Sequence, residues 1–556
     1  MRLACAGCAL ALLVAVVAGA DGQSRRPERG RLVSVSIVPG GQSLAVGDRL
    51  RLALVARYED GSVANLSGAA AWSSSAPPIV RAAGGGRVSA RAVGRATVTA
   101  RVRDGRAVTS VRVGRRSLGP LRVSGVNPRY FVDGAGRVVY LAGDHTWGNL
   151  QDNGTTDPPP RFDYARFLDY LQTYDVRVFR LWAWEQASKS TEVDGDYYFF
   201  PTVYRRTGPG KAKDGKPRFD LRRFDPVYFE RLRERVVAAR ERGLYVIVML
   251  FDGWSVERKG EGDNPWDGHP FNRANNVNGV DGDPAGVGSG RATHTLAFPR
   301  ITRLQEAYVE RVIRAVGDQP NVLYEVSNES SRGSMAWQDH IMRFIRSHER
   351  PAFRHPVGTT VEYPGGSNDE LFGSVADWVA PNGDIDDPAP SSGRKVVLAD
   401  TDHFCGICGT ASFPWRAFTR GLNPMFMDPY NSDEIGLGAL GVDPNDPRWA
   451  VVRRRLGVTQ ALSERLDLKR LVPAGALAST GYCLADTKRG TLYVVYLPDG
   501  GNATIDLTAS ASRLRATWID PDTGAGHAGG VLEGGGTRSL HAPGSGDAVL
   551  VLRAVD

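Results

Sequence analysis

The chain has 556 residues, of which 42% are hydrophobic and 23% charged, so it is too long for a single hydrophobic core and too apolar to be disordered. We expect about two to four domains. The formal net charge is +8, but basic and acidic residues are interleaved along the whole chain. This distribution argues against a nucleic-acid-binding protein, which would gather its basic residues in one stripe or arm.

The N-terminus has the three parts of a secretory signal. Arg2 precedes an apolar run over residues 3–17, and the small residues at 18–20 follow it. The run is shorter than the roughly 18–20 apolar residues that a membrane-spanning helix needs. We therefore expect a signal peptide over residues 1–20 and a mature protein with no membrane segment. Such a protein would be secreted, periplasmic or at the cell surface.

Residues 31–115 alternate apolar and polar residues between frequent turn signals such as Asp60-Gly61. Several short strands at this spacing predict a β-sandwich. The stretches SLAVGDRLRL, YEDGS and AVGRATVTA, together with Trp72, resemble the bacterial Ig-like group 2 domain. The resemblance implies a spacer or tether, so we expect no catalytic residue here and a core position for Trp72.

Residues 120–470 alternate short apolar segments with longer amphipathic ones, of which 226–243, 301–318 and 335–350 predict helices. This alternation predicts a (β/α)8 (TIM) barrel with long loops. Residues 471–556 lose the helical pattern and predict a second β-sandwich. The eight predicted barrel strands are VVYLAGDH, VRVFRLW, YVIVMLF, VLYEVSNE, PVGTTVEY, DWVAPNG, VVLADTDH and PMFMDPY.

Acidic residues follow two of these strands, and in such a barrel the reactive groups lie at the carboxyl ends of the strands. Asn328 and Glu329 end the fourth strand, and Asp400 and Asp402 end the seventh. Cleavage of a glycosidic bond needs one carboxylic acid to protonate the leaving oxygen and one carboxylate to attack or to activate water. We predict Glu329 as general acid/base and Asp400 as nucleophile. Asp402, which strict alternation would place on the same side, is the second choice, and Glu362 is the third.

The barrel resembles the clan-A, or cellulase-like, glycoside hydrolases. In that clan an Asn-Glu pair ends the fourth strand, with Glu as acid/base and Asn binding the sugar 2-hydroxyl, as Asn328 and Glu329 would. An Arg on the second strand supports the nucleophile, and Arg180 matches it. The clan's nucleophile is a Glu, where this chain has Asp400. Because Asp is one methylene shorter, its carboxyl recedes by roughly 1.5 Å, and an inverting mechanism stays open beside the retaining one.

Within the clan, NPRYFVDGAGRVVYLAGDHTW, YVVYLP and ATWIDPDTGA resemble the apiosidase-like group, whose C-terminal domain carries a collagen-binding label. Together with the N-terminal signal, the resemblance implies an exported O-glycosidase that acts on a poly- or oligosaccharide. The competing interpretation is a non-catalytic carbohydrate-binding or adhesion protein built on a degenerate barrel. A protease has no support, because the chain lacks a motif such as H-E-x-x-H or a recognisable triad.

Further residues near the strand ends are candidates for binding the sugar. Aromatic faces pack against the C–H faces of pyranose rings, whereas polar groups bind the hydroxyls. Because tryptophan is often simply buried, we expect roughly half of the four candidate tryptophans to lie in the site. The candidates are Trp147, Trp182, Trp184, Trp254, Asp144, His145, Tyr363 and His403.

The stretch HFCGICG contains His403, Cys405 and Cys408, which raises the possibility of a metal site. A structural zinc site needs four ligands, and the sequence offers no second Cys/His cluster. We expect a local Cys405–Cys408 disulfide or two free thiols instead. We predict neither a metal nor an organic cofactor, and a monomer whose partner is its carbohydrate substrate.

Overall fold

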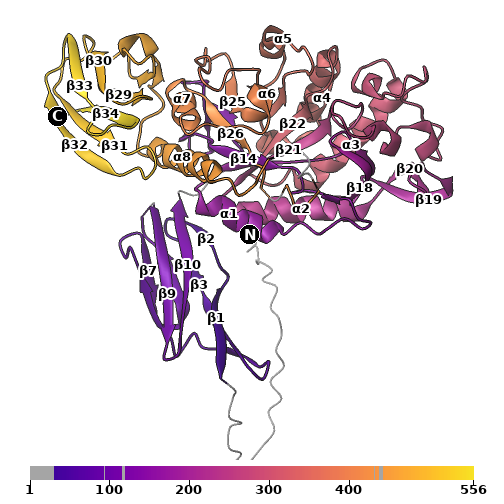
Figure 1. The fold of residues 1–556 in the computed structure, drawn as a ribbon, viewed down its shortest axis with the longest axis horizontal. Helices are drawn as coiled ribbons and strands as arrows, with labels where there is room; N and C mark the ends of the chain where they lie inside the picture. Colours follow the sequence, from indigo (N-terminus) through magenta and orange to yellow (C-terminus); the bar gives the residue numbers. More distant parts are fainter. Residues whose placement is uncertain (1–30, 93, 115–118, 431, 437–441, 556) are drawn as a thin grey trace, which may run out of the picture.

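The computed structural model describes residues 31–555, except residues 93, 115–118, 431 and 437–441. It has an N-terminal β-rich part, a closed barrel and a C-terminal β-rich part (Figure 1). The predicted signal peptide lies outside the described residues. Within the described ranges, none of the helices combines the length and the apolar character that crossing a membrane requires.

The N-terminal part contains three sheets, of order β1-β4-β5, β2-β10-β9-β6 and β3-β8-β7. Alternate residues such as Leu54, Val98 and Val111 are buried between the sheets and form one core. Trp72 packs against this core, as predicted, and donates from Nε1 to Ser67 O at 3.0 Å. The Ig-like assignment stays a prediction. The strands are β1 (Leu32–Val38), β2 (Gln42–Ala45), β3 (Arg49–Arg51), β4 (Ala53–Tyr58), β5 (Val63–Asn65), β6 (Ala71–Ser74), β7 (Val80–Ala83), β8 (Arg87–Ala90), β9 (Gly94–Val102) and β10 (Gly105–Gly114).

Eight parallel strands form the closed barrel, and each lies within one of the eight predicted segments or extends it by one residue. The predicted (β/α)8 fold is therefore confirmed. The barrel closes where Gly143 lies opposite Met425, and a Cβ at Gly143 would lie 1.9 Å from Met425 Sδ, so a larger residue there would displace the Met425 side chain. The strands, in barrel order, are β14 (Gly143–Thr146), β16 (Val178–Leu181), β21 (Tyr245–Asp252), β22 (Val322–Asn328), β23 (Val357–Thr360), β24 (Trp378–Ala380), β25 (Val396–Asp400) and β26 (Asn423–Met427).

Helices pack outside the barrel, and three of them lie within two residues of their predicted bounds. In α2, Pro226 opens the helix, Asp225 accepts from Val227 N, and Phe229 and Leu232 face the core. A three-stranded sheet (β11, Arg122–Val123; β12, Phe131–Val132; β13, Val138–Val139) packs at the start of the barrel strands. The helices are α1 (Tyr164–Thr173), α2 (Pro226–Glu241), α3 (Pro299–Val316), α4 (Met335–His348), α5 (Asn368–Gly373), α6 (Thr401–Cys405), α7 (Phe413–Thr419) and α8 (Pro447–Ser463).

Additional strands that the sequence analysis did not predict extend the loops at the carboxyl end of the barrel. One sheet has the order β15-β18-β17, and β19 pairs with β20 as a hairpin. Tyr197 and Phe199 of this sheet belong to the same aromatic cluster as Trp147, Trp182 and Trp184. The strands are β15 (Asp152–Gly154), β17 (Ser188–Ser190), β18 (Val193–Phe200), β19 (Tyr204–Lys211) and β20 (Pro217–Phe224).

The C-terminal part lies beside α7 and α8 (Figure 1). Its core is continuous with the barrel's outer layer, because Trp415 and Trp449 cluster with Tyr482 and Tyr496. Arg455 of α8 also pairs with Asp522 and Asp547 of this part. Its sheets are β27 (Val472–Pro473), β28 (Cys483–Ala485), β29 (Leu492–Leu497), β34 (Ala548–Ala554), β31 (Leu514–Ile519) and β32 (Gly526–Leu532) in one, and β30 (Asn502–Asp506) with β33 (Thr537–His541) in the other.

Candidate active site

Glu329 follows β22 directly and has an unusual backbone conformation, with φ at 43°. For a residue other than glycine this left-handed conformation costs about 1–2 kcal/mol, so neighbouring groups must stabilise it. Glu329 N donates to Thr360 Oγ1 at 2.8 Å, and Glu329 O accepts from Lys259 Nζ at 2.5 Å. Gly253 permits the close approach, since a Cβ there would lie 2.0 Å from Glu329 O.

The Glu329 carboxylate accepts hydrogen bonds from two rings. Trp254 Nε1 donates to Oε2 at 2.6 Å, and His403 Nδ1 lies 3.0 Å from Oε1. Tyr363 stacks on Trp254 with ring centroids 6.0 Å apart and planes 6° apart. The exposed fraction of Tyr363 is 42%, which leaves its ring open to solvent beside the carboxylate.

Asp400, at the end of β25, is fully buried and occupied by neighbours. Its Oδ1 lies 2.9 Å from His145 Nε2 and accepts from the backbone N of Asp402 at 3.1 Å. Its Oδ2 pairs with Arg180 at 3.0 Å. Burial alone would raise its pKa, but His145 and Arg180 hold the pKa of Asp400 well below its usual range. Asp400 is therefore an ionised carboxylate in a cationic setting.

Arg180, on β16, is the centre of this ionic cluster. Its guanidinium is buried and pairs with Glu325 at 2.9 Å and with Asp402 at 3.3 Å, in addition to Asp400. Asn328 Oδ1 lies 3.5 Å from the same guanidinium. A buried arginine needs several acceptors to offset the loss of hydration, and three carboxylates from β22, β25 and α6 supply them.

Asp402 lies in α6 rather than in an extended strand, so the alternation argument for its direction was wrong. Asp400 caps this short helix by accepting from Asp402 N, which turns the chain at the end of β25. The turn nevertheless brings Asp402 toward Glu329, and carboxylate oxygens of the two residues lie within 4.8 Å. Burial and the Glu329 carboxylate raise the pKa of Asp402 to about 6.

His403 lies between the two carboxyl groups, with a ring nitrogen within 4.8 Å of both. Burial lowers its pKa, but the hydrogen bond with Glu329 and the charge of Asp402 together raise the pKa of His403 to about 9. The ring is therefore an imidazolium at neutral pH. The cluster of Glu329, Asp402 and His403 accordingly combines two acids with one cation at the carboxyl end of the barrel.

The structure separates the predicted site residues into two groups. Most of them contact the ionic cluster or Glu329. Trp147, Trp182 and Trp184 all belong to the buried aromatic cluster, and Trp182 also stacks on His145, with ring centroids 5.5 Å apart. The residues brought together are Glu329, Asp400, Asp402, Asn328, Arg180, His145, Trp182, Trp254, Tyr363 and His403.

Two other candidates belong to different local structures. Glu362 accepts from Ser334 Oγ and Met335 N, both at 2.8 Å, and so holds the start of α4. Asp144 is buried, and its burial together with Asp428 holds its pKa well above the usual range. Neither side chain belongs to the Glu329 cluster.

Glu325, Asp252 and Lys259 also contact the site but were not predicted from the sequence. Glu325 is a charged residue inside an otherwise apolar strand, which is the sequence signal that could have indicated it. Asp252 ends β21 and accepts from Asn328 Nδ2 at 3.3 Å, while burial holds the pKa of Asp252 well above its usual value. Lys259 lies in a loop and bridges Glu329 O to Tyr363 O.

A disulfide joins Cys405 to Cys408, at the end of α6. This is the first of the two states expected for the pair, and it ties the helix that carries Asp402 and His403 to the following loop. Cys483 is a buried free thiol in β28.

Solved glycoside hydrolases share this fold. A glycoside hydrolase family 5 protein from Bacteroides vulgatus aligns with a TM-score of 0.52 at 13% identity, over 79% of this chain and 95% of its own. A second structure from that organism, described as a "putative glycoside hydrolase", aligns with a TM-score of 0.53 at 12% identity, over 92% and 100%. The chain has the fold of these glycoside hydrolases. The identities are too low for the likeness to extend beyond fold.

The C-terminal part matches a family model. Residues 469–553 match the "Putative collagen-binding domain of a collagenase", which agrees with the label expected from the sequence. Comparison with curated proteins finds no sequence that matches the chain.

Proposed function

We propose that the protein is a glycoside hydrolase that cleaves an O-glycosidic bond with Glu329 and Asp402. The observation that carries the proposal is the pair itself, two carboxyl groups with oxygens within 4.8 Å at the carboxyl end of the barrel. This upper limit on the distance between the nearest oxygens fits the roughly 5–5.5 Å of retaining enzymes better than the roughly 6.5–9.5 Å of inverting ones. The barrel fold supports the same class of reaction.

Asp402 suits the role of nucleophile better than Asp400, the first choice from sequence. Both oxygens of Asp400 are occupied by His145, Arg180 and a backbone N–H, and its side chain is 1% exposed. Asp402 is 9% exposed and keeps one ionic contact to Arg180. Asp400 would then be a positioning residue, which holds the Arg180 guanidinium and the start of α6 in place.

The proposed reaction has two steps. In the first, the Asp402 carboxylate attacks the anomeric carbon while Glu329 gives its proton to the leaving oxygen. In the second, Glu329 takes a proton from water, which displaces Asp402 from the sugar with net retention. The pair must hold one proton between its members at the start. Burial and the Glu329 carboxylate raise the pKa of Asp402 to about 6, so Asp402 becomes the ionised nucleophile as pH rises through about 6.

We also propose that the protein is exported from the cytoplasm. The signal at residues 1–20 would place the enzyme outside the cytoplasm, where polysaccharides are the available substrates. The open ring of Tyr363, stacked on Trp254 beside Glu329, supports a sugar or aglycone contact on the leaving-group side. We propose that the chain acts as a monomer without a metal or an organic cofactor.

The competing function is non-catalytic carbohydrate binding. The small exposed fraction of Glu329, 5%, favours it, because a working acid must reach its substrate. Isothermal titration with the same polysaccharides distinguishes the two functions. Binding without any released sugar would assign the barrel to recognition alone.

The deciding experiment screens the purified protein on a panel of polysaccharides and oligosaccharides. The variants are Glu329→Gln, Asp402→Asn and Asp400→Asn, with Glu362→Gln as the matched control outside the cluster. We expect Glu329→Gln and Asp402→Asn to lose about 10²–10⁴-fold in kcat, and the control to keep its activity. Azide should restore turnover with a configuration that differs between the two variants, which identifies nucleophile and acid. Full activity in both variants would end the proposal.

A further inference from the structure

A large cavity lies at the opposite end of the barrel from Glu329. It has a volume of about 730 Å³. Arg177 precedes β16 and Tyr245 begins β21, so the cavity adjoins the starts of the barrel strands. The N-terminal part contributes Arg95 and Arg112, and the loop after α8 closes another side. We call this space the base cavity.

The charges around the base cavity do not balance. Six basic and four acidic side chains line it. Each of the four acids already pairs with an arginine. The pairs are Asp133 with Arg137 at 2.6 Å, Asp175 with Arg95 at 2.6 Å and Arg112 at 3.0 Å, Glu464 with Arg112 at 3.2 Å, and Asp467 with Arg470 at 3.4 Å.

Three of the six basic side chains that line the base cavity take no part in these ion pairs. Over the described residues, the side chains of Arg177, Arg465 and Lys469 have no hydrogen bond and no ion pair. Arg465 and Lys469 are exposed at the rim, where water solvates them, but Arg177 is half-buried. Arg177, Arg465 and Lys469 therefore add positive charge to the lining of the base cavity without a salt bridge to any described acid, and Glu464 and Asp175 act on Arg177 only at longer range.

Arg177 is the informative member of this group. Its guanidinium lies 5.7 Å from the centre of the Tyr245 ring, which holds it over an aromatic face. Burial, and then the positive charge of Arg112, lower the pKa of Arg177. Glu464 and Asp175, which already pair with Arg112, offset only part of this lowering. A partly buried guanidinium in this setting is stabilised further when an anion binds beside it.

We propose that the base cavity binds an oxyanion, namely a carboxylate, sulfate or phosphate group, through Arg177 with Arg465 and Lys469. The planar guanidinium matches such groups with two parallel hydrogen bonds, and a lysine adds a point charge. The volume falls within the roughly 300–1,000 Å³ of small-molecule sites, so an acidic oligosaccharide fits as well as a free ion. The site is distinct from the Glu329 cluster and independent of the proposed hydrolysis.

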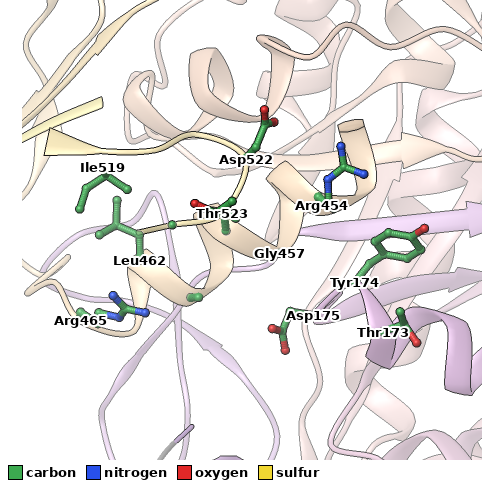
Figure 2. Close-up of a pocket in the computed structure, with 13 residues that line it drawn as sticks. Thr173, Tyr174, Asp175, Arg454, Gly457, Leu462, Arg465, Ile519, Asp522 and Thr523 are labelled. Atoms are coloured by element: carbon green, nitrogen blue, oxygen red, sulfur yellow. The ribbon is translucent and has the colours of Figure 1, made fainter. Parts of the chain in front are cut away.

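A smaller cavity beside α8 adjoins the base cavity. Its volume is about 300 Å³, and Asp175 and Arg465 line both spaces. Figure 2 shows Gly457 of α8 between Asp522 and Thr523 of the C-terminal part on one side and Asp175 on the other. The oxyanion site thus lies where the N-terminal part, the barrel and α8 meet.

The test is calorimetric titration of the full-length mature protein at fixed ionic strength, about 150 mM NaCl, so that general screening stays constant. The probes are sodium sulfate, a trisaccharide of galacturonate and the neutral trisaccharide of galactose. The variants are Arg177→Gln and Lys469→Gln, with Arg103→Gln as control, because Arg103 is an exposed arginine in the β9–β10 turn.

We expect saturable binding of sulfate or of the acidic trisaccharide with a stoichiometry of one, and no binding of the neutral one. Arg177→Gln and Lys469→Gln should weaken it at least tenfold, whereas Arg103→Gln should bind as the wild type does. If the acidic trisaccharide binds more tightly than sulfate, the ligand of the base cavity is an acidic sugar. If sulfate binds more tightly, the ligand is a free ion. No saturable binding of either anion, or unchanged affinity in both cavity variants, would overturn the proposal. Lys469 lies at the rim, so its variant remains informative even if Arg177→Gln fails to fold.

Discussion

Glu329 and His403 meet across the carboxyl end of the barrel, with His403 Nδ1 3.0 Å from Glu329 Oε1. One residue follows the fourth barrel strand and the other lies in the helix after the seventh. Their contact ties opposite sides of the barrel together at the point where the chemistry is proposed. It also places a positive charge between two carboxyl groups that would otherwise repel each other.

Replacement of His403 by Gln should destabilise the protein in a pH-dependent way. The folded pKa of about 9 lies above the ordinary value of 6.5, so the charged ring stabilises the fold fully below pH 6.5. That contribution disappears as pH rises through 9. The free energy of unfolding should fall by on the order of 3 kcal/mol at pH 6 and little at pH 10.

Urea denaturation of the wild type and His403→Gln at both pH values measures this difference. The exposed His527, changed to Gln, is the control and should show no effect at either pH. An equal loss at pH 6 and pH 10 would show that the ring acts through packing alone.

Asp400→Asn should be far more destabilising than Asp402→Asn. Loss of the Asp400 charge leaves Arg180 and His145 buried beside a neutral amide, which costs about 3–5 kcal/mol for a broken buried pair. Asp402 makes one longer contact to Arg180, and burial with the Glu329 carboxylate raises its pKa, so loss of its charge should cost less than loss of the Asp400 charge. Chemical denaturation at pH 7 compares the two.

The same pair of variants has a pH signature. Because the pKa of Asp400 is depressed in the folded protein, its contribution is present above its ordinary pKa of about 3.8 and is lost as pH falls further. The difference between wild type and Asp400→Asn should therefore shrink in strongly acidic buffer. A constant difference would contradict the ionic role.

Gly253→Ala should disturb the turn that presents Glu329. The added Cβ would lie 2.0 Å from Glu329 O, so the backbone of one strand end must move. We expect a loss of about 1–3 kcal/mol in stability, typical of an overpacked site, and a lower kcat with a similar KM. Gly125→Ala, where no atom lies within 4 Å, is the control. Comparable kinetics for the two variants would refute the positioning role of this turn.

Glu362→Ala should lower stability without changing catalysis. Its carboxylate accepts from Ser334 Oγ and Met335 N at the start of α4, and loss of such a cap costs about 0.5–2 kcal/mol. Thermal unfolding measures the loss, and kcat per folded molecule should match the wild type. A large fall in kcat would return Glu362 to the candidates for nucleophile.

The barrel strands and three main helices were predictable from sequence because each buries a continuous run or one apolar face. The stretch from Val322 to Glu329 is the clearest case, since a buried strand that ends in Asn-Glu fixes both the element and the place of its side chains. The same logic located Asp400, because parallel strands bring their ends to one edge of the sheet, whereas Arg180 was predicted from the family resemblance.

The turn after β25 was not predictable in this way. Asp400 ends the strand and caps α6 by accepting from Asp402 N. A helix of five residues is too short to show an apolar periodicity in the sequence. Lys259 was missed for a related reason. It acts through backbone carbonyls of Glu329 and Tyr363, and contacts between distant loops leave no local pattern.

The aromatic core that joins the barrel to the C-terminal sheets has a consequence for how the chain can be divided. Trp415 and Trp449 would lose the apolar partners Tyr482 and Tyr496 if the C-terminal sheets were removed. A polypeptide that stops near residue 470 would expose this face to water and aggregate. The C-terminal sheets are therefore part of the folding unit of the barrel, and a shortened chain would need another apolar surface to cover Trp415 and Trp449.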